Sequence, residues 1–321
     1  FPRVSQTWGS FWNQGRLTNT QKVDQFAEPS KIFDAFLTSI NRSQKPALYF
    51  HHVELPHVPW KYLPSGKEYE YRYFGYFGVD GLTRKERWVN DDWVVARGYQ
   101  RHLLQVGYVD LLLGRLMERL KQTELYDRCL LIVTADHGAS FYPGEPRRHV
   151  TNTTYQDILP VPLFVKLPNQ KTGSINDDNV ETIDLLPTIV DVLDIPVKWK
   201  FEGTSLFSQS KPKRKSIYTG SEILRFEPQL VKKNDSVKRK LDLFGSGTTE
   251  NRLYKNGPFA GMIDRPIEEL ALENSNTTGI VLNDPEMYEQ VDMKSNVLPV
   301  FVTGRTMSKT TDPLYLGIAV N

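Results

Sequence analysis

The tripeptide Asp136-His137-Gly138 contains the residue types that point most directly to chemistry in this sequence. It follows the run Cys129–Ala135, whose mostly apolar or β-branched residues predict a strand buried on both faces. Ligands bind at the carboxyl edge of open α/β sheets, and we expect both side chains to lie there. A carboxylate oxygen and an imidazole nitrogen together suit one divalent cation such as Zn²⁺ or Mn²⁺. The alternative is an aspartate that caps a turn beside a structural histidine.

Two other segments carry residues of the same kind. His57 lies in a loop that Pro56 and Pro59 keep irregular, after a predicted strand at 47–53. An imidazole there can exchange a proton near neutral pH, or it can bind an anion. Arg148, or its neighbour Arg147, can balance negative charge on oxygen, the alternative being an exposed loop charge.

The remaining histidines are weaker candidates. His51 and His52 alternate on the predicted strand, so at most one of them faces a site, and His52 is the better candidate for an outer contact. His149 follows the arginines closely enough to share their task. His102 falls within a predicted amphipathic helix, where we expect it to belong to the scaffold.

Composition limits the classes of function. Of 321 residues, 39% are hydrophobic and 12% aromatic, which predicts a globular protein. The net charge of +2 gives no overall attraction to nucleic acid or anionic lipid, and we expect the basic clusters at 211–215 and 232–240 to be solvated loops. Cys129 is the single cysteine, so no internal disulfide can form. The sequence has no signal peptide and no apolar run of the ~20 residues that span a membrane.

Alternating strands and helices up to about residue 222 predict an α/β layered domain with a mostly parallel sheet and helices on both faces. A β-rich region is predicted at 223–321, partly flexible between 229 and 250. The opening Phe1-Pro2 and the apolar end at residues 316–320 indicate an excised part of a longer protein. The predicted elements are helices at 31–40, 97–123 and 182–193, and strands at 47–53, 129–135, 161–167, 216–220, 279–282 and 297–302.

The order of these motifs resembles the alkaline phosphatase superfamily, specifically its sulfatase and phosphoglycerol-transferase branch. The matching pieces are Pro56-His57-Val58-Pro59, Thr134–Gly138, the arginines, Val161-Pro162-Leu163, Asp184–Thr188 and Gly203–Leu206. The resemblance covers roughly residues 30 to 220. The stretch Leu55–Gly66 is similar to membrane-anchored bacterial sulfatase-like proteins.

The resemblance implies an alkaline-phosphatase-like α/β fold and a sulfate- or phosphate-ester substrate at a divalent metal ion (Ca, Mn or Zn). Asp136 and His137 match metal ligands, His57 matches the loop histidine that contacts the transferring group or protonates the leaving oxygen, and Arg148 matches the cation that steadies the transition state. It also implies an extracytoplasmic domain of a bacterial membrane protein, anchored through segments absent from this sequence. No nucleic-acid partner is expected.

One departure from the family pattern matters. The family's nucleophile and an acidic metal ligand are expected well upstream of His57, and Cys129 lies inside a predicted strand where it cannot serve as that nucleophile. We therefore expect a fragment, incomplete at the amino terminus, that is inactive alone and holds metal weakly.

Two alternatives remain open. One is an envelope phosphoglycerol or phosphoethanolamine transferase with a threonine nucleophile. The other is a non-catalytic member that binds glycan through the aromatic segment 69–95. A nuclease is disfavoured because the near-neutral charge offers no path for a polyanion.

Overall fold

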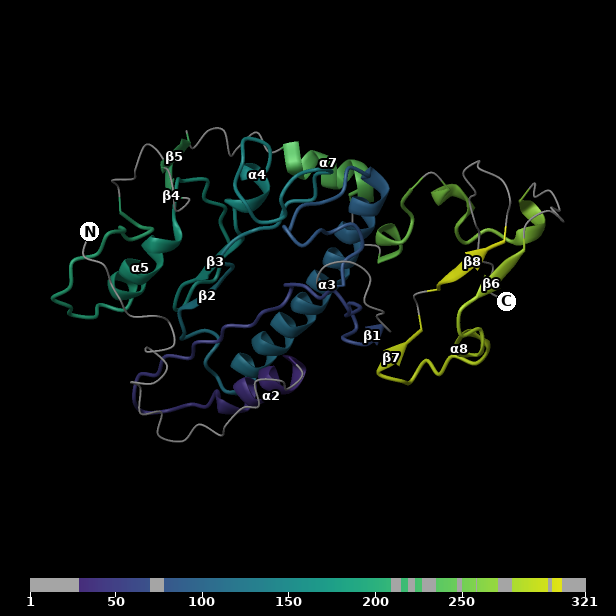
Figure 1. The fold of residues 1–321 in the computed structure, drawn as a ribbon. Coiled ribbons are helices and arrows are strands. Elements are labelled where there is room, and N and C mark those ends of the chain that lie inside the picture. The colour runs from purple at the N-terminus through teal and green to yellow at the C-terminus, as the bar shows by residue number, and fades with distance from the viewer. Residues whose placement is uncertain are drawn as a thin grey trace. The chain divides into compact units, whose positions relative to one another are not determined.

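The computed structural model describes residues 29–69, 78–208, 215–218, 223–226, 235–246, 250–257, 259–270, 279–299 and 302–307. The chain divides into two compact units, residues 1–54 and 55–321, which are described separately. Figure 1 shows the helices and strands with the labels used below. No helix within these ranges combines the length and apolarity that a membrane span requires.

The first unit contains helix α2 (Pro29–Ser39), which confirms the predicted helix. Its Phe36 ring stacks on His51, with 4.5 Å between the ring centroids. Burial, and then the neighbouring His52, lowers the pKa of His51, as expected for a structural histidine.

The strand prediction at 47–53 is wrong, because this segment has no regular structure and pairs with no strand among the residues described. Leu48 and Phe50 remain 83% and 79% exposed. A β-branched or aromatic run becomes a strand only where a neighbouring strand supplies the backbone hydrogen bonds.

Helix α3 (Asp92–Gln122) is the longest element of the second unit. It begins five residues before the predicted start at Arg97, because the Asp91 carboxylate accepts the backbone N–H groups of Trp93 and Val94 at 2.9 and 3.0 Å. Val95, Tyr99 and Leu112 are among the buried residues of α3. The helix thereby forms the support on which the loops of this unit pack.

Strands β2 (Leu131–Thr134) and β3 (Leu163–Lys166) confirm the strands predicted on either side of the site, and they pair antiparallel. β2 is half-buried rather than covered on both faces, so that detail of the prediction is wrong. The other pairs are β1 (Glu68–Tyr69) with β7 (Val297–Leu298), parallel, and two antiparallel pairs, β4 (Lys215–Tyr218) with β5 (Ile223–Phe226) and β6 (Ile280–Leu282) with β8 (Gly304–Thr306).

These four described pairs are separate, and three of them are antiparallel. The mixture of helices and strands agrees with an α/β domain, whereas the layered, mostly parallel sheet is not confirmed. The shorter elements are α4 (Tyr155–Ile158), η1 (Thr182–Asp184), α5 (Leu185–Val192), η2 (Glu250–Leu253), η3 (Ala260–Met262), η4 (Ile267–Glu269) and α8 (Glu286–Glu289).

Helix α7 (Asp235–Phe244) lies where the sequence predicted a partly flexible stretch. Its amphipathic pattern is short and lies between polar segments, so this helix was not predicted from the sequence. Phe244 is buried and packs edge-on against Tyr99 of α3, with 5.3 Å between centroids. The region beyond residue 222 therefore contributes to the main core, although the predicted domain boundary itself stays a prediction.

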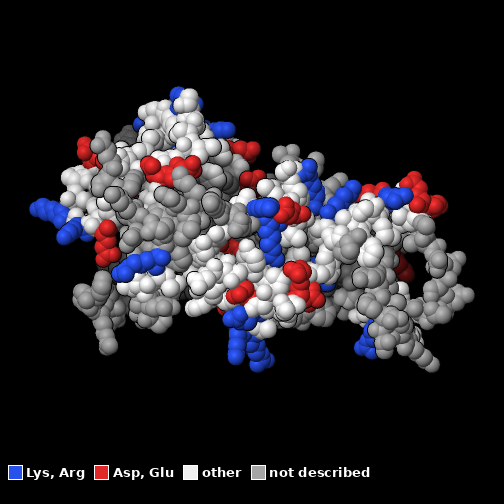
Figure 2. Space-filling model, turned by 90° about the horizontal axis from the view of Figure 1, so that it is seen from above, with Lys and Arg blue, Asp and Glu red and all other residues white. Residues whose placement is uncertain are grey.

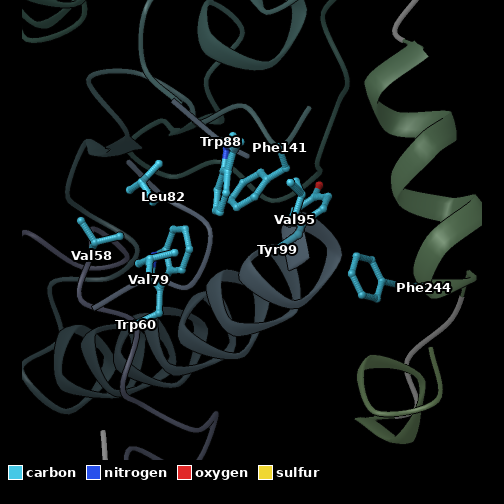
Figure 3. Packing of buried hydrophobic residues seen from close by; sticks show 9 residues of the cluster. All are labelled: Val58, Trp60, Val79, Leu82, Trp88, Val95, Tyr99, Phe141 and Phe244. Carbon is cyan, nitrogen blue, oxygen red and sulfur yellow. The ribbon is translucent and has the colours of Figure 1, made fainter. Parts of the chain in front are cut away.

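A single aromatic core holds together the loops of the second unit (Figure 3). Trp60 and Trp88 are both 1% exposed and stack at 6.3 Å, and each lies 5.6 Å from Phe141. Phe141 in turn stacks on Tyr99 at 4.2 Å. Burying one such side chain stabilises a fold by about 1.5–3 kcal/mol. The core comprises Val58, Trp60, Val79, Leu82, Trp88, Val95, Tyr99, Phe141 and Phe244.

Two segments that match the family pattern, Asp184–Thr188 and Gly203–Leu206, are hydrogen-bonded to each other and are called the closing motif below. The buried Asp184 carboxylate accepts the backbone N–H groups of Glu181 and Thr204 at 2.9 and 2.8 Å. Thr188 donates its hydroxyl to the Asp184 carbonyl and accepts the N–H of Leu206. A side chain at Gly203 would meet the Ile183 carbonyl at 2.3 Å, so this close approach requires glycine. The motif ties residues 181–206 together.

Candidate functional site

The loop that carries His57 is fixed from both sides. Val58 and Trp60 anchor it in the aromatic core, and the Trp60 indole donates to the Pro56 carbonyl at 3.0 Å. Gln105 of α3 is completely buried, donates to the His57 carbonyl at 2.7 Å and accepts the N–H of Lys61 at 3.1 Å. The predicted irregular loop is confirmed, and its imidazole is half-buried.

Arg147 and Arg148 share one carboxylate, that of Glu86. Arg148 binds it through both oxygens, Nε to Oε2 at 3.0 Å and Nη2 to Oε1 at 3.1 Å. Arg147, whose side chain is 2% exposed, donates from Nη2 to Oε2 at 2.9 Å. Burial opposes ionisation of Glu86, but the hydrogen bonds and charges of the two arginines outweigh it, so the pKa of Glu86 is lowered. Glu86 is thus held as an anion.

Arg148 also reaches His57, with Nη1 3.3 Å from Nε2 of the imidazole. A guanidinium can only donate a hydrogen bond, so Nε2 accepts in this contact. The other ring nitrogen, Nδ1, lies 2.7 Å from the Val58 carbonyl oxygen, which can only accept. These two contacts fit the imidazole tautomer with its proton on Nδ1, in which the Nε2 lone pair lies beside a cation.

Asp136 and His137 follow the end of β2, as the sequence predicted. The Asp136 carboxylate is 79% exposed, and its Oδ1 accepts the N–H of His137 at 2.9 Å. Nδ1 of His137 donates to the Gly138 carbonyl at 2.7 Å, which leaves Nε2 as the nitrogen that can bind a metal. Nε2 and Oδ2 of Asp136 lie 3.8 Å apart.

The pair fits two positions of a metal coordination sphere. An exposed carboxylate oxygen and an imidazole nitrogen with a fixed tautomer are ligands that divalent cations accept. Within the residues whose placement is described, no group of three His, Cys, Asp or Glu side chains comes together as a candidate metal site. The described chain therefore supplies two donors.

Backbone contacts link the segment after Asp136 to the arginines. The Ser140 N–H donates to the Arg147 carbonyl at 2.8 Å, and the Trp88 indole donates to the Ser140 carbonyl at 2.8 Å. Ser140 follows Asp136 by four residues, a chain that spans at most ~14 Å. Gly138 is required here, because a side chain on it would meet the Asp157 carbonyl at 1.9 Å.

The structure thus places His57 and Arg148 in direct contact, and it places Asp136 beside His137. The roles assigned to these four residues stay predictions. His52 belongs to the first unit and is exposed, and His149 is exposed near the arginines, so their supporting roles also stay predictions. His102 packs against Trp60 and Phe141 in the core, as expected of scaffold.

Two residues of this site were missed in the sequence, Glu86 and Gln105. Glu86 lies in a turn and Gln105 on α3, and each acts through contacts more than forty positions away. No local pattern distinguishes Glu86 from Glu145, or Gln105 from Gln100. To predict these two residues, one would have to know which segments the aromatic core brings together.

Cys129 lies in a bend just before β2, so the prediction that it lies inside the strand is wrong. Burial raises the pKa of its thiol, although nearby Lys166 acts in the opposite direction. That this residue is not the family's nucleophile stays a prediction.

Positive and negative side chains are mixed on one face of the molecule (Figure 2). On the face shown in Figure 2, Lys and Arg side chains are interspersed with Asp and Glu side chains among the described residues. The second half of the basic cluster at 232–240 lies in α7, where Arg239 packs over the Tyr142 ring at 4.3 Å, so the predicted solvated loop is wrong for this part. Most of the cluster at 211–215 lies outside the described residues.

Comparison with known proteins adds sequence relatives to this geometry. The profile of the Sulfatase family matches residues 5–195. The chain is 23% identical over 155 residues to an endo-4-O-sulfatase of Bacteroides thetaiotaomicron, covering 47% of this chain and 30% of the relative. It is 30% identical over 101 residues to arylsulfatase K of Homo sapiens, covering 32% and 18%. It is 23% identical over 224 residues to lipoteichoic acid synthase of Staphylococcus aureus, covering 62% and 31%.

The chain spans less than a third of the length of these curated relatives. Their names, one synthase among sulfatases, confirm the resemblance to the sulfatase and transferase branch of the alkaline phosphatase superfamily. The family profile covers more than half of the 321 residues. The chain therefore belongs to the Sulfatase family.

Proposed function

We propose that the protein to which this chain belongs hydrolyses sulfate esters at a divalent metal ion. The observation that carries the proposal is the contact between Arg148 and His57 in a chain of the Sulfatase family. The Ser140–Arg147 backbone hydrogen bond joins the segment after Asp136-His137 to that of the arginines. A bound divalent ion would polarise an ester oxygen and lower the barrier to nucleophilic attack. Asp136 and His137 are the residues that would hold it.

The chain's own residues have distinct tasks in this proposal. Arg148 binds the non-bridging oxygens of the ester and balances the charge that develops on them. His57 presents an unprotonated Nε2, so in the described geometry it can take a proton from an attacking group. Protonating a leaving oxygen, the role that the resemblance implies, would first require a proton on Nε2. The nucleophile stays unassigned.

A phosphoglycerol or phosphoethanolamine transferase is the second candidate. The alignment with lipoteichoic acid synthase covers 62% of this chain, more than the alignments with the two sulfatases. The same arginine and imidazole would serve a phosphoryl group equally well, because both esters present non-bridging oxygens. An extracytoplasmic location on a bacterial membrane protein is part of either proposal.

A glycan-binding member without catalysis is less favoured. The aromatic segment 69–95 was the expected binding surface, but Tyr69 and Trp88 are 4% and 1% exposed and belong to the interior. Trp93, at 43%, is the more exposed aromatic residue of the described part. Residues 70–77 lie outside the described ranges.

Metal content and ester turnover of the full-length protein test the proposal. Aryl sulfate and aryl phosphate are assayed in parallel with Asp136→Ala and with Asp127→Ala as a matched control, since Asp127 is also exposed and precedes β2. The proposal predicts aryl sulfate turnover and a loss of both metal and activity in Asp136→Ala alone. Turnover of aryl phosphate but not aryl sulfate would favour the transferase. No effect of Asp136→Ala on either quantity would refute its assignment.

A further inference from the structure

Arg148 is an exposed residue with a well-defined orientation. Its side chain is 38% exposed, and an exposed arginine has many rotamers unless its contacts fix one of them. Glu86 accepts from Nε and Nη2, which occupy one edge of the guanidinium. This two-point contact leaves Nη1 as the nitrogen that meets His57.

Glu86 is itself held at its backbone. Its N–H donates to the Thr83 carbonyl at 2.9 Å, and its carbonyl accepts the N–H of Arg147 at 2.8 Å. Its φ of 53° lies in the left-handed region, which glutamate seldom adopts. Two residues later Trp88 enters the aromatic core. The carboxylate is therefore presented from a rigid turn.

We propose that Glu86 is the positioning residue that aligns Arg148 with His57 and so fixes the Nδ1-protonated form of the imidazole. This inference rests on the proposed function, because it concerns the residues assigned to the ester. Glu86 touches no substrate in the proposal. It acts by orienting the guanidinium, and the guanidinium in turn requires Nε2 to remain an acceptor.

Glu86→Gln removes the two-point contact and the negative charge of Glu86 while it keeps the size of the side chain. The amide keeps the shape of the side chain, but its NH₂ group cannot accept a hydrogen bond, so the two-point contact with Arg148 is lost. Glu145→Gln is the matched control, because Glu145 is similarly buried and pairs with Arg87 at 3.9 Å in the same part of the fold. The ring nitrogens of His57 are followed by ¹⁵N NMR, with His57→Gln identifying the signals.

The expected result is one Nδ1-protonated form of His57 in the unchanged protein and in Glu145→Gln, and a mixture of forms in Glu86→Gln. In the full-length protein kcat for the ester falls roughly tenfold in Glu86→Gln. The affinity for inorganic sulfate, measured by calorimetry, does not fall, because both arginine charges remain. A variant that had simply lost its fold would lose both.

The inference is overturned when the His57 signals of Glu86→Gln match those of Glu145→Gln. If Glu86→Gln does not fold, Glu86→Asp takes its place. It keeps the negative charge, but its side chain is one methylene too short for the two-point contact with Arg148. Unchanged His57 signals in this variant would then overturn the inference. If Glu86→Gln shows a mixture of His57 forms but the unchanged full-length protein does not turn over the ester, the proposed function alone is refuted. Turnover with unaltered His57 signals in the Glu86 variants would refute the positioning role alone.

Discussion

Nη1 of Arg148 lies 3.3 Å from Nε2 of His57, although 91 positions separate the two residues in the sequence. The aromatic core explains this proximity. Trp60 follows His57 by three positions, Trp88 follows Glu86 by two, and Phe141 lies between the Asp-His pair and the arginines, and all three aromatic rings pack together (Figure 3). The core thereby brings three separate loops to one place.

Arg148→Lys tests the need for a forked cation. Lysine keeps the charge but cannot bind Glu86 and His57 in the same geometry, so we expect kcat/KM for the ester to fall about 10- to 100-fold. Steady-state kinetics of the full-length protein measure this effect. Arg87→Lys is the control, since Arg87 forms a comparable but looser pair with Glu145. Equal losses in both variants would argue against a specific role for Arg148.

Acid should destabilise the protein through His102. Burial, followed by the charge of Lys240, lowers the pKa of His102 from 6.5 to about 4. Between these values the unfolded chain binds a proton that the folded chain does not, so the free energy of unfolding decreases as the pH falls through this window. The decrease due to this residue is about 3 kcal/mol.

His102→Phe should remove that part of the pH dependence, because phenylalanine carries no proton in either state. Urea unfolding at several pH values between 4 and 7 measures it, with the exposed His149→Gln as control. The same pH slope in His102→Phe and in the unchanged protein would show that His102 titrates normally.

Gly138→Ala should destabilise the protein strongly. The new methyl group would meet the Asp157 carbonyl at 1.9 Å, and backbone atoms cannot move aside cheaply. We expect a loss of about 2–4 kcal/mol. Gly114→Ala is the matched control on the exposed face of α3, where nothing lies within 4 Å, and it should stabilise by about 0.5–1 kcal/mol. Thermal unfolding distinguishes the two, and equal effects would mean that the close approach at Gly138 is not present.

Asp184→Asn should loosen the closing motif. Both carboxylate oxygens accept backbone N–H groups, and an amide can offer only one acceptor, which leaves one buried donor without its partner. The expected cost is about 1–3 kcal/mol in unfolding free energy. Asp178→Asn, on an exposed stretch nearby, should cost less than about 0.5 kcal/mol. Hydrogen exchange at Thr204 reports the lost contact directly, and unchanged protection there would contradict this role of Asp184.

Local patterns in the sequence are sufficient to predict several elements. The apolar spacing of α2 and α3 and the branched runs of β2 and β3 depend on neighbouring residues, so these four elements were predicted. Gly138 and the prolines around His57 also act locally. These features are enough to single out His57, Asp136, His137 and Arg148 as candidates.

Contacts between residues far apart in the sequence cannot be predicted from local patterns. Glu86 is separated from Arg147 and Arg148 by about sixty positions, and nothing in its own segment indicates that two arginines converge on it. The segment 47–53 failed for the opposite reason, because its strand-like residues have no described partner strand. Helix α7 was missed because its packing on Tyr99, rather than its sequence pattern, marks it as part of the core.

The central claim is that Asp136 and His137, the proposed metal ligands, form one site with His57 and Arg148. Paramagnetic broadening by Mn²⁺ in the full-length protein reports how far each imidazole lies from the bound ion. Added Mn²⁺ should broaden the imidazole signals of His137 and His57 together, and Asp136→Ala should abolish both effects. Strong broadening of His137 with sharp, unchanged signals from His57 at saturating Mn²⁺ would place the two pairs apart and contradict the account.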